Sequence, residues 1–303
     1  MKFSGVIPIL ATPFHEDESF DAESMAGLVG LMKRIGVDGI TVLGVLGEAN
    51  RLNDAEREAV VRTAVDAADG LPVIAGASAS GTRAACDLAH MAESLGASAV
   101  MITPHAEATP SDERVFKHFS TITAATALPV VLQDHPASSG VHMPIDLMLR
   151  MVRELPSISC IKEEAVPTAP KIRALKAGMG ERSIPILTGL GALYGLFDLE
   201  AGSDGFNTGF AFPEVLMEMV AAARVADWKR ARELYMRFLP LIVFEQQPGV
   251  AVRKEILRKR GAIATNRVRH PGAPLNPDTG KQLAQLVDSL LPDADIKAPL
   301  KVG

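Results

Sequence analysis

The sequence predicts a (β/α)₈ barrel with a C-terminal helical extension. Eight short apolar segments occur between residues 5 and 209, and amphipathic segments separate and follow them. Strands that alternate with helices in this way are typical of a parallel sheet. A doubly wound sheet would show fewer units and usually a glycine-rich first turn. After residue 223 only helical patterns remain, so we expect a barrel at residues 1–223 and an extension at residues 224–303.

The expected strands are short, and most of them are rich in Val and Ile. Continuous apolar runs of this length indicate strands that are buried on both faces, as in a parallel sheet covered by helices. The runs end in Gly, Pro, Ser, Thr or Asp, which are common where a strand passes into a loop. They lie at residues 5–12, 39–44, 71–78, 98–104, 128–134, 158–164, 184–189 and 204–209.

Helical patterns fill the intervals and the C-terminal part. Asn53 and Ser111 are expected N-caps, and Gly36 and Gly96 are expected to end helices. The barrel helices are expected at residues 22–36, 53–68, 81–96, 111–126, 144–155, 168–178, 191–202 and 213–223. The extension is expected to contain helices at residues 227–245, 249–261 and 277–291.

Composition excludes several classes of protein. The chain has 303 residues, 48% of them hydrophobic, which is enough for a large core. The net charge of −5 and the scattered basic residues argue against a nucleic-acid partner. Cys86 and Cys160 lie in apolar contexts and do not have a zinc or disulfide spacing. The N-terminal apolar run is too short for a signal peptide, and no segment is long enough to span a bilayer. We therefore expect a soluble cytoplasmic protein with no membrane partner.

One strand carries a lysine and a glutamate on the same face. The segment ISCIKEEAV occupies residues 158–166, so Lys162 and Glu164 point to one side of the strand and Glu163 to the other. Lys162 lies near the C-terminal end of the strand, where barrel enzymes hold their catalytic groups. The lysine could reach solvent and pair with Glu164. Alternatively, a desolvated amine could attack a ketone and form a Schiff base. The position in a barrel mouth favours the second interpretation.

Five segments together resemble a known family. They read GVIPILATPF, GVDGITVLGVLGEANRL, LPVVLQDHPASSGVHM, CIKEEAV and QQPGVAVRKEIL. Their order and spacing resemble the dihydrodipicolinate synthase/N-acetylneuraminate lyase family of class I aldolases, over nearly the whole chain. The resemblance implies a barrel, a small-molecule 2-oxo acid substrate and a Schiff base on Lys162. It also implies no metal and no organic cofactor, and usually a homotetramer.

The chain departs from this family in its hydroxyl groups. Where the family has a tyrosine on the fifth strand, this chain has Gln133. The loop that offers threonine in the family offers Val45 and Leu46 here. The tyrosine that follows the fourth strand is replaced in TPHAEA, which offers His105 and Ala106. The proton relay of the family is therefore absent.

Substrate binding is also expected to differ. The dihydrodipicolinate synthases have an arginine after the fifth strand that grips the carboxylate of an amino-acid aldehyde. This chain has Ser138 there, which argues against dihydrodipicolinate synthesis. Without the threonines, we expect Val45, Leu46 and Gly47 to hold the substrate carboxylate, mainly through backbone N–H groups.

The expected seventh and eighth strands end in residues that could line the barrel mouth. Gly189 would allow a substrate to approach closely, and Asn207 or Thr208 could bond substrate hydroxyls. These residues could equally be turn residues that only end strands.

Glu164 is the best candidate acid or base. Burial in the barrel mouth could raise the pKa of its carboxyl into a useful range, although it could also form a plain ion pair with Lys162. Gln133 cannot titrate, but it can hold a water, the lysine or the carboxylate. His105, Asp134 and His135 are weaker candidates, and strand parity turns Asp134 away from the lumen.

The combination of Gln133 with Lys162 and Glu164 resembles the L-2-keto-3-deoxyarabonate dehydratase branch of the family. The resemblance implies a lyase of pentose catabolism that forms α-ketoglutaric semialdehyde. It places Glu164 at the C4 hydroxyl, with Gln133 bridging to the lysine and the glutamate. Two alternatives stay open: an aldolase or lyase that releases pyruvate from a 2-keto-3-deoxy acid, and a non-catalytic sensor of 2-oxo acids.

Overall fold

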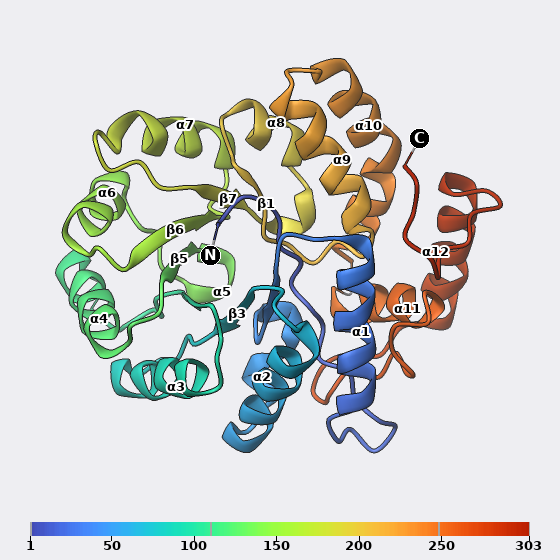
Figure 1. The fold of residues 1–303 in the computed structure, drawn as a ribbon, viewed down its shortest axis with the longest axis horizontal. Helices are drawn as coiled ribbons and strands as arrows, with labels where there is room; N and C mark the ends of the chain where they lie inside the picture. Colours follow the sequence, from blue (N-terminus) through green and yellow to red (C-terminus); the bar gives the residue numbers. More distant parts are fainter. Residues whose placement is uncertain (1, 110, 248, 303) are drawn as a thin grey trace.

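The computed structural model describes residues 2–109, 111–247 and 249–302, and it contains an eight-stranded parallel sheet surrounded by helices (Figure 1). The order of the strands is β1-β8-β7-β6-β5-β4-β3-β2. The predicted (β/α)₈ barrel is confirmed. The strands are β1 (Gly5–Val6), β2 (Ile40–Val42), β3 (Val73–Gly76), β4 (Ala99–Ile102), β5 (Val130–Asp134), β6 (Ile158–Glu163), β7 (Ile186–Thr188) and β8 (Gly205–Phe206).

The two ends of the sheet meet between β1 and β2. The N–H of Thr41 donates to the carbonyl of Pro8 at 2.8 Å, and the N–H of Leu10 donates to the carbonyl of Thr41 at 2.8 Å. A parallel bridge joins Ile9 and Thr41. These bonds close the sheet into a barrel, so the C-terminal ends of the strands gather at one mouth.

Nine α-helices accompany the strands in the described part of the barrel. Asn53 forms the expected cap, because its side chain accepts from the N–H of Glu56 and the Glu56 carboxylate accepts from the N–H of Asn53. Ser111 precedes α4 without a capping hydrogen bond. The helices are α1 (Ala22–Ile35), α2 (Asp54–Ala68), α3 (Thr82–Ser94), α4 (Asp112–Ala125), α5 (Pro136–Ser139), α6 (Ile145–Glu154), α7 (Thr168–Gly178), α8 (Gly195–Glu200) and α9 (Pro213–Arg224).

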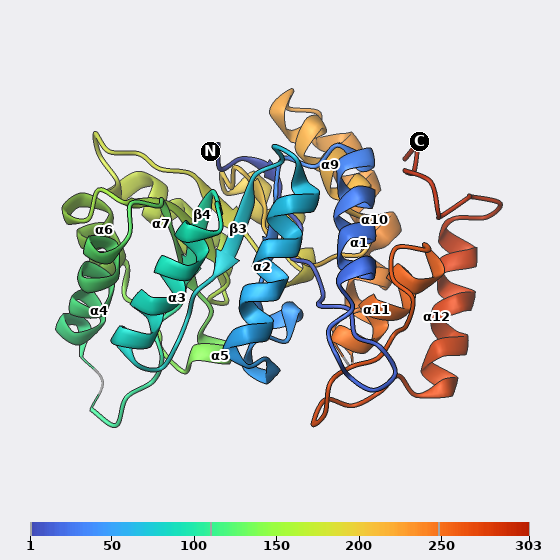
Figure 2. The ribbon, with the colours of Figure 1, turned by 60° about the horizontal axis from the view of Figure 1, so that its bottom comes forward.

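The C-terminal part adds α10 (Trp228–Phe244), α11 (Val250–Lys259) and α12 (Pro277–Leu290). Figures 1 and 2 place these helices together on one side of the barrel, beside α1 and α9, with α12 outermost. Their buried side chains form one apolar cluster with those of α8 and α9. The division expected after residue 223 falls inside α9, and it stays a prediction. No helix in the described ranges is both long and apolar enough to cross a membrane.

A buried ion pair joins the C-terminal part to the barrel. The guanidinium of Arg260, which follows α11, donates to both carboxylate oxygens of Glu214 on α9, at 2.5 and 3.3 Å. It also donates to the carbonyl of Ala211 at 2.7 Å. Arg260 is 2% exposed and Glu214 is 6% exposed, so neither charge has water as an alternative partner.

Replacement of Arg260 by leucine should destabilise the protein by about 3–5 kcal/mol, because it leaves the Glu214 carboxylate buried and unpaired. Chemical denaturation at a fixed protein concentration would measure the loss. Arg258→Leu, two residues earlier and inside α11, is the matched control. Its partner is Glu255 and its side chain is 44% exposed, so its loss should stay within about 1 kcal/mol. Equal losses in both variants would contradict the assigned role of the buried pair.

Candidate active site

A cavity of about 160 Å³ lies at the C-terminal mouth of the barrel. It contains the two residues that the sequence placed on one face of the sixth strand, Lys162 and Glu164. β5 and the residue after it contribute Gln133 and His135, and the residues after β8 include Thr208. The cavity therefore collects polar side chains from several strand ends, as is usual in barrel enzymes.

The side chain of Lys162 points into the barrel and not into solvent. Lys162 is 2% exposed and Glu164 is 7% exposed. The pairing register places Lys162 directly opposite Gln133 on β5. Because inward side chains of neighbouring parallel strands lie beside one another, this register brings the lysine, the glutamate and the glutamine together.

The carboxylate of Glu164 is held by three donors. Its Oε2 lies 3.1 Å from Nζ of Lys162 and accepts a hydrogen bond from Nε2 of Gln133 at 2.7 Å. Its Oε1 accepts from the N–H of Leu190, after β7, at 3.0 Å. Gln133 thus contacts the glutamate directly. The lysine and the glutamine share one carboxylate oxygen, which fixes the orientation of the group.

The ionisation of Glu164 differs from the expectation. Burial acts to raise the pKa of its carboxyl, but the Lys162 ammonium, His135 and the hydrogen bond from Gln133 together outweigh burial. The pKa therefore lies below its ordinary value, and the expected rise is wrong because a cation lies 3.1 Å away. In the resting site Glu164 is a carboxylate, ready to accept a proton.

Gly189 makes room for this carboxylate. A Cβ atom at Gly189 would lie 2.0 Å from Oε1 of Glu164, closer than any real contact. The sequence predicted that a substrate would approach Gly189 closely. In the structure the side chain of Glu164 makes this close approach.

The loop after β2 supplies part of the cavity wall. Val45 and Leu46 line the cavity, and Gly47 lies buried behind them. The N–H of Gly47 donates to the carbonyl of Gly44 at 2.9 Å, and the carbonyl of Gly47 accepts from Oγ1 of Thr12 at 2.6 Å. Within the described residues the N–H of Leu46 has no hydrogen bond, so of these two amides only that of Leu46 is free to bind a ligand.

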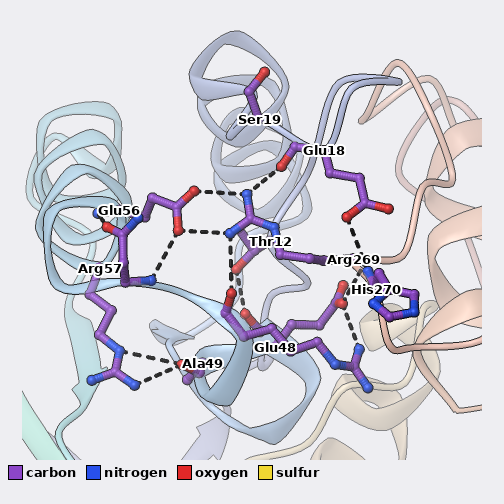
Figure 3. A network of polar contacts seen from close by, with 12 residues as sticks. Thr12, Glu18, Ser19, Glu48, Ala49, Glu56, Arg57, Arg269 and His270 are labelled. Atoms are coloured by element: carbon purple, nitrogen blue, oxygen red, sulfur yellow. Dashed lines mark hydrogen bonds and ion pairs between the residues drawn. The ribbon is translucent and has the colours of Figure 1, made fainter.

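Glu48 anchors this loop to the C-terminal part of the chain. Its Oε1 accepts from Nζ of Lys254, on α11, at 2.6 Å, and its Oε2 accepts from Arg51 and from the N–H of Arg269. Figure 3 shows Arg269 between Glu48 and Glu56, where its guanidinium makes two hydrogen bonds of 2.7 Å to the Glu56 carboxylate. The side chains of Glu48 and Lys254 are completely buried, so the loop is fixed by a network that solvent does not weaken.

Asn207 and Thr208, the two residues expected to bind substrate hydroxyls, lie in different surroundings. Asn207 lies inside the barrel, where its Nδ2 donates to the carbonyl of Ile7 and to Oγ1 of Thr41, both at 2.8 Å. It does not line the cavity. Thr208 does line it, and its Oγ1 accepts from the N–H of Gly191 at 2.7 Å.

The sequence matches a known family over almost its whole length. The profile of the Dihydrodipicolinate synthetase family matches residues 2–290. The chain belongs to this family. It is 32% identical over 296 residues to the L-2-keto-3-deoxyarabonate dehydratase of Azospirillum brasilense, covering 96% of each chain. It is 32% identical over 251 residues to the 4-hydroxy-tetrahydrodipicolinate synthase of Methanopyrus kandleri, covering 79% of this chain and 80% of the relative.

Solved structures of the family superpose over almost the whole chain. The dihydrodipicolinate synthase of Rhodopseudomonas palustris has a TM-score of 0.90 and 35% identity, covering 95% of this chain and 97% of its own. YagE of E. coli K12, solved in complex with pyruvate, has a TM-score of 0.88 and 26% identity, covering 95% of this chain and 98% of its own. Family membership makes this chain one of a set of lyases and aldolases.

Residues on the opposite face of β5 and β6 form a separate acidic cluster. Asp134 and Glu163 are completely buried, and Lys171 on α7 forms an ion pair with Asp134. Burial raises the pKa of the Glu163 carboxyl, and the neighbouring Asp134 raises it further, so Glu163 is protonated. Burial also raises the pKa of Asp134, while Lys171 and a hydrogen bond with Glu163 act in the opposite direction. Asp134 faces away from the lumen, as strand parity predicted.

The remaining histidine candidates have other surroundings. His135 lies at the rim, with Nδ1 2.5 Å from Oγ of Ser138. His105 lines a larger cavity of about 500 Å³, together with His118 and His142, and neither Lys162 nor Glu164 lines that space. Among the residues that the structure describes, no group of three or more His, Cys, Asp and Glu side chains is arranged to hold a metal.

Two residues of the cavity were missed by sequence reasoning. Gln246 and Arg253 come from the C-terminal part and line the cavity beside Gly191. The only signal in the sequence was their place in the family-like segment QQPGVAVRKEIL, which carries no indication of where the side chains point.

Replacement of Gly189 by alanine should displace the Glu164 carboxylate from the N–H of Leu190, because the new methyl group would overlap Oε1. We expect a loss of about 1–3 kcal/mol from overpacking, measured by chemical denaturation. A crystal structure of the variant should show a rotated Glu164. Gly81→Ala is the control, since nothing lies within 4 Å of its Cβ position. An unmoved glutamate in the Gly189→Ala variant would contradict this account.

Replacement of Glu163 by glutamine should make the melting temperature less sensitive to alkaline pH. The folded-state pKa of Glu163 lies above its unfolded value, so wild-type stability falls as pH rises above about 5. Glutamine keeps the shape and the donor without titrating. The melting temperature of the variant minus that of the wild type should therefore increase between about pH 5 and about pH 9. A constant difference, like that of the exposed control Glu218→Gln, would refute the raised pKa.

Proposed function

We propose that this chain is a Schiff-base-forming dehydratase of a 2-keto-3-deoxy sugar acid. The substrate that fits best is L-2-keto-3-deoxyarabonate, and the product would be α-ketoglutaric semialdehyde. One observation carries the proposal: a buried lysine lies 3.1 Å from a carboxylate that a glutamine also holds, in a cavity at the barrel mouth.

The first step joins Lys162 to C2 of the substrate. The lysine must lose a proton before it can attack, and Oε2 of Glu164 is the carboxylate oxygen that lies against its Nζ. The neutral amine adds to the ketone. A proton passes from the attached nitrogen to the oxygen at C2, Glu164 returns the proton that it took as the second one, and the oxygen leaves as water. The result is an iminium ion on Lys162 and a carboxylate on Glu164.

The second step removes the hydroxyl at C4. The iminium cation makes the C3 protons acidic, because it withdraws the electron pair of the carbanion. Glu164 takes one C3 proton and an enamine forms. The same carboxyl then donates that proton to the C4 oxygen while the C4–O bond breaks, and water leaves. One carboxyl group therefore serves as base and then as acid.

The last steps release the product. Loss of the C4 hydroxyl leaves a C3–C4 double bond conjugated with the iminium. Loss of a proton from C5 and addition of a proton at C3 give an enol between C4 and C5. Loss of the hydroxyl proton and addition of a proton at C4 then convert this enol into the aldehyde at C5. Hydrolysis of the iminium frees Lys162. The balance is one water lost from the substrate.

A tyrosine-dependent cleavage of C3–C4 fits this chain less well. Retro-aldol cleavage needs a base at the C4 hydroxyl, which is the place of a phenol in the family pattern. The chain contains two tyrosines, Tyr194 and Tyr235, and neither lines the cavity. The hydroxyl of Tyr235 donates to the carbonyl of Leu193 at 2.6 Å. Beside Lys162 the cavity holds Gln133 and Glu164 instead of a phenol. A carboxyl group at this place suits elimination, because it can take the C3 proton and give it to the C4 oxygen.

The relatives support a 2-oxo acid substrate. The similar protein of Azospirillum brasilense is an L-2-keto-3-deoxyarabonate dehydratase, and YagE was solved with pyruvate. The N–H of Leu46 is the group we assign to the substrate carboxylate, and Thr208 the group we assign to a hydroxyl. The homotetramer, the cytoplasmic location and the absence of a cofactor stay predictions.

Reduction with sodium borohydride in the presence of pyruvate should attach one reduced pyruvate to Lys162, detected by peptide mass spectrometry. Lys162→Ala should abolish the adduct, and Lys281→Ala, at an exposed position, should leave it unchanged. Glu164→Gln should still be trapped, but more slowly, because the group that takes the lysine proton is lost. Its kcat should fall by about 10²–10⁴-fold because the proton carrier of the elimination is lost as well.

Product analysis with 2-keto-3-deoxypentonates decides between the reactions. We expect a semialdehyde and no pyruvate. Pyruvate release, detected in a coupled lactate dehydrogenase assay, would show that the reaction is aldol cleavage and not dehydration. Trapping that survives Lys162→Ala would place the imine on another amine and discard the proposed role of Lys162. Ligand binding without any turnover would point to a sensor.

A further inference from the structure

Arg253 is a buried cation with unused donors. It belongs to α11 and is 5% exposed. Its Nε donates to Oε2 of Glu245 at 2.9 Å. Among the described residues, its two terminal nitrogens have no hydrogen-bond partner, although the side chain lines the cavity that holds Lys162. A structural pairing with Glu245 therefore accounts for only one of the guanidinium nitrogens.

The loop after β7 lies against both Glu164 and the guanidinium of Arg253. Oε2 of Glu164 contacts the lysine, and Oε1 accepts from the N–H of Leu190. The next residue, Gly191, is the neighbour of Arg253: a Cβ atom there would lie 2.8 Å from Nη2 of the arginine. Nε2 of Gln246 lies closer to that position, at 2.1 Å, but it already donates to the carbonyls of Leu190 and Ile242.

Arg253 is held firmly in this place. Glu245 is completely buried, and its Oε1 also accepts from the N–H of Ala211 at 3.2 Å. The next residue of α11, Lys254, is fixed by Glu48 at 2.6 Å. A guanidinium that is positioned before a ligand arrives loses little entropy when it binds oxygen atoms.

We propose that Arg253 binds the oxygen atom on the carbon beyond C4 of the substrate, and so selects 2-keto-3-deoxy acids with a polar distal end. This inference rests on the proposed function, which places C2 at Lys162 and the C4 oxygen at Glu164. The next oxygen along a five-carbon chain is at C5. Arg253 is the cation beside the loop that holds Glu164, and its two terminal nitrogens have no hydrogen-bond partner among the described residues. A guanidinium with free N–H groups favours oxygen acceptors, either hydroxyl or carboxylate.

Two substrates and one variant test the inference. The pair is a 2-keto-3-deoxypentonate and 4-hydroxy-2-oxopentanoate, which carries a methyl group in place of the C5 hydroxymethyl group. Substrate consumption is measured, so the assay does not depend on the product. Arg253→Met should lower kcat/KM for the pentonate by about 10–100-fold, mainly through a higher KM, because a charged hydrogen bond is lost. The methyl analogue should lose almost nothing, since it lacks the oxygen.

Trapping with pyruvate distinguishes a role of Arg253 at the distal end of the substrate from a role at the substrate carboxylate. It has no atom beyond C3, so its rate of borohydride trapping on Lys162 should change by less than about 2-fold in Arg253→Met. A large loss of trapping in this variant would show that Arg253 holds the 2-oxo acid carboxylate instead, which overturns the inference. Failure of wild-type protein to be trapped or to consume either substrate would instead overturn the proposed function.

Controls address folding. Arg258→Met removes a guanidinium from the same helix, where its partner is Glu255 outside the cavity, and should not change the selectivity. If Arg253→Met leaves Glu245 unpaired and unfolds the protein, the double variant Arg253→Met with Glu245→Gln removes both charges and receives the same assays. Equal losses for the pentonate and the methyl analogue in that variant would mean a purely structural role and overturn the inference.

Discussion

The contact between Lys162 and Glu164 is the interaction on which the site depends. Two opposite charges with almost no exposure must be paired and hydrogen-bonded, because an isolated buried charge costs several kcal/mol. The glutamate meets this requirement with donors from Gln133 and Leu190. The missing side chain at Gly189 provides the space. The pair therefore depends on the register of β5 against β6, which places Gln133, and on the path of the chain after β7, which places the N–H of Leu190.

The two faces of the same strand hold carboxyl groups in opposite states. Inside the barrel a neighbouring ammonium keeps Glu164 ionised, while outside it burial and a second carboxyl keep Glu163 protonated. Such a separation of pKa values by environment lets one group act as a base while the other stays a neutral hydrogen-bond donor. The proton on Glu163 also removes a repulsion that would otherwise act between buried charges directly behind the reactive face.

The C-terminal helices complete the site and do not merely cover the barrel. α11 sends Lys254 to the loop after β2, and it sends Arg253 into the cavity itself. Arg260, just beyond the same helix, is bound to Glu214 on α9. α11 and the residue after it therefore anchor the loop, line the cavity and dock on the barrel, and the extension also shares an apolar core with α8 and α9.

The sequence alone determined the barrel, the eight strand positions and the shared face of Lys162 and Glu164, because alternation of apolar runs and strand parity are local properties. It also placed Gln133 beside them, through the resemblance to the family. Tertiary structure decided what depends on neighbours distant in the chain. The lowered pKa of Glu164 follows from an ammonium 3.1 Å away, the role of Gly189 from the side chain of Glu164, and the place of Arg253 from the packing of α11 beside the cavity. Electrostatic and steric effects act through space, so the order of residues could not reveal them.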